Sequence, residues 1–150
     1  MAGFAVLPAE AGPPEISEQQ LAAAAQQGLS EILDLWRDEN FELLYTRTIP
    51  SGSYDKYYFL DRMVNSIRRP ACCWEKMQDV RASYVSRERV TLIARVGMEM
   101  DGAGVKFFTK NFDLIRIDGV WKIPMGEILS LAEAVGYRAF PREIIEKPLP

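Results

Sequence analysis

Residues 114–123 read Leu-Ile-Arg-Ile-Asp-Gly-Val-Trp-Lys-Ile, and they contain the strongest hairpin signal in the chain. Asp118–Gly119 stands between two runs rich in β-branched and aromatic residues, which is a strong signal for a two-residue β-hairpin loop. The stretch therefore predicts two antiparallel strands, over residues 105–117 and 120–125, joined by a tight turn.

A two-residue loop sets the register of this hairpin, because the pairs continue outward from the turn by alternation. The predicted pairs are Ile117–Val120, Arg116–Trp121, Leu114–Ile123 and Phe112–Met125. Partners across a hairpin share a face, so one set of side chains is expected on the concave side of a curved sheet: Phe108, Lys110, Phe112, Leu114, Arg116, Trp121 and Ile123. The opposite face would carry Thr109, Asn111, Asp113, Ile115 and Ile117, and its apolar members suit a dimer surface.

Two further strands are predicted upstream of the hairpin. Residues 89–100 alternate apolar and polar side chains, and residues 74–85 alternate less regularly. A reversal at Ser86–Arg87 and a glycine-rich turn at residues 101–104 would connect them into a meander. In this arrangement Trp74, Val80, Ala82 and Tyr84 would share one face of the first of these strands.

Three helices are predicted before the strands. Ser17 and Gln20 have the spacing of a capping box, and apolar side chains then recur at helical period: Leu21, Ala25, Leu29, Ile32 and Trp36. Gly28 lies on the same side, where it would permit close packing against a sheet. A second short helix is expected over residues 41–45, and a third over residues 59–67. Pro70 would end the third helix.

The oddest local sequence follows, at residues 68–76. Arg68 and Arg69 are expected at the C-terminus of the third helix, where cations complement the helix dipole. They could instead hold an anionic ligand or the carboxylate of a partner. Cys72 and Cys73 are interpreted as two small apolar residues that enter a strand, since neighbouring residues rarely close a disulfide and a cysteine pair alone is no zinc site. Thiol reactivity promoted by the arginines is the alternative.

The ends of the chain are interpreted as arms. Residues 1–15 and 137–150 are rich in proline, so we expect one domain over residues 16–136, closed by a short helix that stops at Gly136. The first residues fail as an intact secretory signal, because no Lys or Arg precedes the apolar stretch and Pro8 breaks it. A cytoplasmic location is slightly favoured, and a periplasmic or anchored protein whose leader was removed is the alternative.

The order of these elements, three helices and then a meander of long strands, resembles the nuclear transport factor 2-like superfamily, which has a cystatin-like fold. The hairpin at residues 114–123 looks like the last hairpin of that superfamily, and Phe41-Glu42-Leu43-Leu44-Tyr45 looks like its second helix. The resemblance covers roughly residues 17–131. It implies a bacterial-type α+β cone, in which a strongly curved antiparallel sheet wraps three N-terminal helices, with a pocket at the wide end and a homodimer through the sheet.

Composition excludes several classes of function. The chain has no histidine, which excludes histidine-dependent triads and histidine-ligated metal centres, and no metal or cofactor is expected. The net charge of −3 is poor for binding nucleic acid. No apolar run reaches the roughly 18 residues of a membrane span.

The side chains left to line a pocket are few. The polar candidates are Tyr45, Tyr57, Tyr84, Lys110 and Arg116, and the aromatic candidates are Trp74 and Trp121. Each also has a structural interpretation, as a packed ring or as a cation that reaches the rim. The predicted inner face offers no carboxylate as a general base, which the isomerases and dehydratases of the superfamily place there. Asp113 would face inward only if a β-bulge reversed its side.

The sequence therefore favours a module without catalysis, which binds a small apolar ligand or assembles with other proteins. The alternative is a small pocket enzyme, an isomerase, dehydratase or hydrolase, with Asp113 or a tyrosine as base and Arg116 as electrostatic partner. The position of Asp113 distinguishes the two hypotheses. Contact with Arg116 or Tyr45 inside the cone would favour the enzyme, whereas a cone filled by hydrophobic side chains would favour the binding module.

Overall fold

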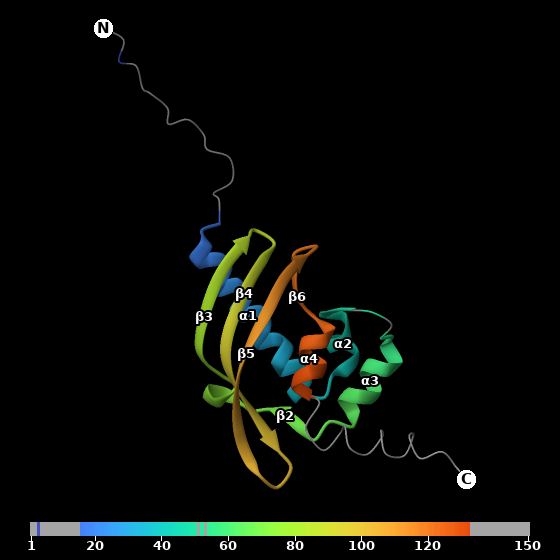
Figure 1. Cartoon of the computed structure of the whole chain (residues 1–150). Helices are drawn as coiled ribbons and strands as arrows, with labels where there is room; N and C mark the ends of the chain where they lie inside the picture. Colours follow the sequence, from blue (N-terminus) through green and yellow to red (C-terminus); the bar gives the residue numbers. More distant parts are fainter. Residues whose placement is uncertain (1–2, 4–15, 51, 53, 133–150) are drawn as a thin grey trace, which may run out of the picture.

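The computed structural model describes residues 3, 16–50, 52 and 54–132, and it shows an α+β protein built on one curved sheet (Figure 1). Its elements are, in chain order, α1 (Glu18–Arg37), α2 (Phe41–Thr46), β1 (Thr48–Ile49), α3 (Lys56–Val64), β2 (Arg68–Pro70), the short 3-10 helix η1 (Cys73–Glu75), β3 (Met77–Ser86), β4 (Arg89–Met100), β5 (Gly104–Ile117), β6 (Val120–Pro124) and α4 (Met125–Ala132). The two predicted arms and the expected stop at Gly136 lie outside the described residues, apart from Gly3.

The six strands form a mixed sheet in the order β1-β6-β5-β4-β2, with β3 also paired to β4. All pairs are antiparallel except β1 with β6, so the expectation of a purely antiparallel sheet is wrong for β1. This two-residue strand carries no alternating pattern from which it could be predicted. Arg47, directly before β1, holds this strand against β6. The carbonyl of Arg47 accepts from the amide of Ile123, and its Nε donates to the carbonyl of Trp121.

The hairpin between β5 and β6 has the predicted register. Ile117 pairs with Val120 and Arg116 with Trp121, around a loop whose two residues, Asp118 and Gly119, have φ values of 52° and 78°. Both values are positive, as a tight hairpin turn of the primed type requires.

The predicted pairing of Phe112 with Met125 is wrong. The β5–β6 ladder is paired only as far as Ile115 with Lys122, and β6 ends at Pro124. Proline has no N–H to continue a ladder, and Met125 begins α4 instead.

The register between β4 and β5 runs without a shift from the Arg89–Ile115 pair to the Met100–Gly104 pair. No bulge therefore reverses the side on which Asp113 lies. The register shifts fall on β3 instead, one of them between Gln78 and Arg81. Trp74, predicted in that strand, lies before it in η1, which corrects the expected grouping with Tyr84.

Helix α1 covers the concave side of the sheet and lies behind β4 and β5 in the view of Figure 1. The Ser17–Gln20 capping box is present, with both of its hydrogen bonds. Gly28 packs so closely on the sheet that a Cβ atom there would lie 2.6 Å from the Cβ of Trp121. The close approach predicted for this glycine is thereby confirmed.

Helix α3 ends at Val64, earlier than predicted, so the placement of Arg68 and Arg69 at a helix C-terminus is wrong. Asn65 closes the helix, because both its backbone and its side-chain N–H groups donate to the carbonyl of Asp61. The arginines then enter β2, which pairs with the end of β4. Pro70 is tolerated there because β2 is at the edge of the sheet.

One hydrophobic core joins the helices to the concave face of the sheet. It contains α1 side chains such as Leu29 and Trp36, strand side chains such as Phe112 and Trp121, and Ile128 from α4. No helix within the described part of the chain is long and apolar enough to cross a membrane.

Candidate functional site

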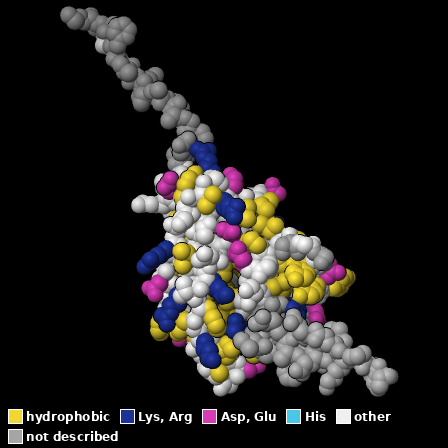
Figure 2. Space-filling model, viewed as in Figure 1, with side chains coloured by type: hydrophobic (Ala, Val, Ile, Leu, Met, Phe, Trp, Pro, Cys, Tyr) yellow, Lys and Arg dark blue, Asp and Glu magenta, His cyan; other side chains and the backbone are white. Residues whose placement is uncertain are grey.

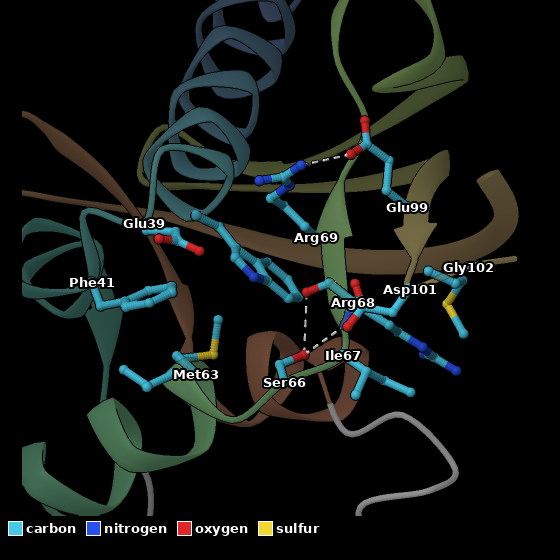
Figure 3. Close-up of a pocket in the computed structure, with 13 residues that line it drawn as sticks. Glu39, Phe41, Met63, Ser66, Ile67, Arg68, Arg69, Glu99, Asp101 and Gly102 are labelled. Carbon is cyan, nitrogen blue, oxygen red and sulfur yellow. Dashed lines mark hydrogen bonds and ion pairs between the residues drawn. The ribbon is translucent and has the colours of Figure 1, made fainter. Parts of the chain in front are cut away.

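A pocket of about 310 Å³ lies at the end of the molecule where α1 and α3 finish, beside β2 and the β4–β5 turn (Figure 3). The residues that line it are Trp36, Glu39, Phe41, Met63, Val64, Ser66, Ile67, Arg68, Arg69, Glu99, Met100, Asp101 and Gly102. They come from three stretches of the chain, residues 36–41, 63–69 and 99–102, so the pocket exists only in the folded protein.

The lining of the pocket is both apolar and charged. In Figure 3, Phe41 and Met63 lie at the left with Glu39 above them, whereas Arg69 and Glu99 lie at the upper right, beside β2. Ser66 lies at the lower side of the pocket, and its hydroxyl donates to the carbonyl of Ala132 at 2.8 Å. This bond ties the floor of the pocket to the last residue of α4.

Glu99 is shared by two arginines at the edge of the pocket. Its carboxylate accepts from Arg37 at 2.8 Å and from Arg69 at 3.0 Å. Hydrogen bonds from Arg37 first, and then from Arg69, hold the pKa of Glu99 below its ordinary value. Arg69 therefore has a carboxylate partner within the protein, which it shares with Arg37.

Arg68, the neighbour of Arg69, has no carboxylate partner among the described residues. Its side chain lies over the ring of Phe108 at 4.4 Å, and its Nη1 donates to the carbonyl of Leu131 at 3.0 Å. Its Nε is buried without an acceptor, and no carboxylate of the described residues pairs with it. The residue is only 9% exposed, and burial lowers the pKa of its guanidinium from the ordinary value.

None of the residues predicted to line a pocket lines this one. Trp121 is buried beneath α1, and Arg116 pairs with Glu88 in the turn between β3 and β4. Tyr45 is half-buried against the ring of Phe59 in the helical layer. The remaining candidates are exposed side chains, namely Tyr57, Trp74, Tyr84 and Lys110.

Asp113 faces away from the concave side of the sheet. Its carboxylate accepts from Arg89 at 2.9 Å and from Thr91 at 2.9 Å, and neither Arg116 nor Tyr45 is a partner. Its backbone N–H donates to Glu127 of α4 at 2.9 Å, at the point where β6 has ended and leaves the edge of β5 unpaired.

Among the described residues, Glu127 is the one carboxyl group whose pKa is raised. Burial, and secondarily the nearby charge of Asp113, raises its pKa to about 7, against the hydrogen bond from the Asp113 amide. No local pattern in the sequence indicates this pair, since the two residues are 14 positions apart and meet only where β6 turns into α4.

Cys72 and Cys73 form a disulfide with each other, which corrects their interpretation as free, apolar residues. Both are exposed, and neither lies inside a strand, because Cys72 lies between β2 and η1 and Cys73 is the first residue of η1. Among the described residues, no three His, Cys, Asp or Glu side chains gather as metal ligands would.

The pocket was missed because its residues show no shared pattern in the sequence. The one available signal was the pair Arg68–Arg69, for which binding of an anion was an open alternative. A comparison of the chain with models of known protein families finds no match, and neither does a comparison with curated proteins.

Proposed function

We propose that this protein is a binding module without catalysis, which takes a small organic acid into the pocket between α1, α3 and β2. We also propose that it is a member of the nuclear transport factor 2-like superfamily, with which its α+β architecture and curved sheet are compatible. The observation that carries the binding proposal is the buried guanidinium of Arg68.

A buried charge is costly unless a partner compensates it, and arginine has five N–H donors arranged to match a carboxylate. Arg68 uses one of these donors on a backbone carbonyl and leaves its buried Nε without an acceptor. A bound carboxylate at this wall of the pocket would supply the missing charge and acceptors. The adjacent Arg69 does not have this need, because Glu99 already pairs with it.

The remainder of the lining limits the ligand further. Glu39 and Asp101 also line the pocket, but they are exposed, so water screens their charges more than that of Arg68. Trp36 and Met63 supply buried apolar surface on the inner side. These features support a ligand with one acid group and a short apolar part, rather than the wholly apolar molecule expected from the sequence.

The enzyme alternative has less support. Asp113, its proposed base, is bound to Arg89 and Thr91 on the other face of the sheet. The concave side is filled by Phe112, Leu114 and Trp121.

The binding proposal is tested by titrating the full chain with a panel of short carboxylic acids, each beside its neutral amide, with calorimetry as the readout. We expect acids to bind and their amides not to bind. Arg68→Met should weaken binding by about 10- to 100-fold, because a hydrogen-bonded charge contributes roughly 1.5–3 kcal/mol.

Arg69→Met is the matched control, and it should change binding only slightly. Arg68→Met should also leave the free energy of unfolding unchanged or raise it, because it removes an uncompensated buried charge. Equal binding of acids and amides, or a strong loss of stability in Arg68→Met, would contradict the proposal and make Arg68 a structural cap of α4.

A second candidate function is assembly through the face of the sheet opposite α1. Ile93 and Ile117 are each 37% exposed, and Figure 2 shows hydrophobic side chains interspersed with charged ones on the side of the sheet that faces the viewer. We propose that this face forms a homodimer. Wild type should sediment as a dimer, Ile93→Lys as a monomer, and Val64→Lys, on α3, as a dimer; a monomeric wild type would refute the assembly.

A further inference from the structure

The loop that contains the two cysteines is anchored at both ends. We define the cysteine loop as residues 71–76, between β2 and β3. The amide of Ala71 donates to the carbonyl of Gly97 at 2.8 Å, and the amide of Gly97 donates to the carbonyl of Lys76 at 3.3 Å. The ammonium of Lys76 pairs with Asp34 of α1 at 2.8 Å.

These bonds fasten the two ends of the loop to β4 and α1, while the middle of the loop stands in solvent. Cys72 and Cys73 are exposed, and Trp74, the next residue, is 73% exposed. A reagent can therefore reach the disulfide without any part of the core opening. The chain has two cysteines in all, so no third thiol competes for exchange.

We propose that Cys72–Cys73 is a surface thiol–disulfide exchange site that is reduced by an external dithiol. One thiolate of the dithiol attacks one sulfur of the pair, which breaks the S–S bond and forms a mixed disulfide. The second thiol of the reductant then displaces the cysteine. The protein gains two electrons and two protons, and the reductant leaves as its own disulfide.

The adjacency of the two cysteines selects a dithiol over a monothiol. After attack by a monothiol, the released cysteine is next to the mixed disulfide and re-forms the original bond at high effective concentration. A dithiol resolves the mixed disulfide within its own molecule and competes with this reversal. Dithiols should therefore reduce the site more than about tenfold faster than monothiols at equal thiol concentration.

Reduction also has a local structural consequence. Cys73 has a φ of 68°, in the left-handed region that residues with a side chain rarely adopt. The bond to Cys72 restrains this conformation, and its removal lets the backbone of the loop change beside Trp74. The other two tryptophans, Trp36 and Trp121, are buried and should not respond.

The test uses the native full chain, with maleimide adducts counted by intact mass before and after treatment with a small dithiol, without denaturant. We expect no adduct before treatment and two adducts after it, and reoxidation should restore the first result. Adducts on the untreated oxidised chain, or reduction that requires unfolding, would overturn the proposal. A disulfide between two chains, seen on a non-reducing gel, would also overturn the proposal.

Two variants test whether the effect of reduction is confined to the cysteine loop. The double variant Cys72→Ser/Cys73→Ser should take up no maleimide under any condition. The change in tryptophan fluorescence on reduction should be lost in Trp74→Phe. If the change persists in that variant, reduction reaches the core and the site is not a local surface device. None of these outcomes depends on ligand binding at Arg68.

Discussion

Gly28 shows how one missing side chain positions a helix. A Cβ atom at this position would lie 2.6 Å from the Cβ of Trp121, and neither backbone can move away without opening the core. Glycine normally weakens a helix interior by about 0.5–1 kcal/mol relative to alanine, so its presence here reflects packing rather than helix propensity.

We therefore expect Gly28→Ala to lower the free energy of unfolding by about 1–3 kcal/mol, since overpacking outweighs the gain in helix propensity. Urea denaturation measures this. Ala23→Gly, on the exposed side of the same helix, is the control and should cost only about 0.5–1 kcal/mol. A variant Gly28→Ala more stable than wild type would show that α1 is not in close contact with the sheet.

The second prediction at this scale concerns Glu127. Its pKa is raised from 4.5 to about 7, mainly by burial, so its charged form is disfavoured in the folded protein. The stability that its protonated form contributes is complete below pH 4.5 and is lost as the pH rises through 7.

Glu127→Gln keeps an oxygen that can accept from the amide of Asp113 and removes the charge. Because the carboxyl group is half-buried and partly screened, we expect the variant to gain about 1–2 kcal/mol over wild type at pH 8 and little at pH 4.5. Thermal unfolding of both proteins across this range is the measurement. A difference that does not vary with pH would contradict the raised pKa.

At the scale of elements, the cysteine loop depends on the absence of a side chain in β4. A Cβ atom at Gly97 would collide with the backbone oxygen of Glu75 and would touch the ring of Phe107. The oxygen of Glu75 belongs to the backbone, so it cannot move aside as a flexible side chain would.

Gly97→Ala should therefore displace the loop from β4, cost about 1–3 kcal/mol, and speed the alkylation of the reduced cysteines. Thr109→Ala, an exposed change on neighbouring β5, should alter neither property. Denaturation and the rate of maleimide uptake measure the two effects. Unchanged uptake would mean that the loop holds its position without this contact.

The elements also show where local patterns succeed. Residues 89–100 carry an apolar side chain at every second position and form β4 with the predicted bounds, and Asp118–Gly119 sets the hairpin register as expected. Arg68–Pro70 was predicted as the end of a helix, because three residues are too few to display a period. Their strand conformation comes from pairing with β4, about 30 residues away.

At the scale of the whole molecule, one core spans the helices and the concave face of the sheet. We expect a single cooperative unfolding transition, with far-ultraviolet circular dichroism and tryptophan fluorescence changing together. Trp121→Ala, which empties part of this core, should cost about 3–5 kcal/mol. Trp74→Ala, at an exposed position, should stay within about 0.5 kcal/mol of wild type. Two separate transitions would show that sheet and helices fold independently.

The helices, the long strands and the central hairpin can be predicted from the sequence, because each rests on a signal within a few neighbouring residues. The absence of histidine chemistry follows from the sequence as well. Three features follow from tertiary contacts instead: the burial of Arg68, the side of the sheet on which Asp113 lies, and the hydrogen bond from the amide of Asp113 to Glu127. These features depend on contacts between residues 14 to 63 positions apart, which no local period encodes. The pocket also depends on such contacts, because three separate stretches of the chain build it together.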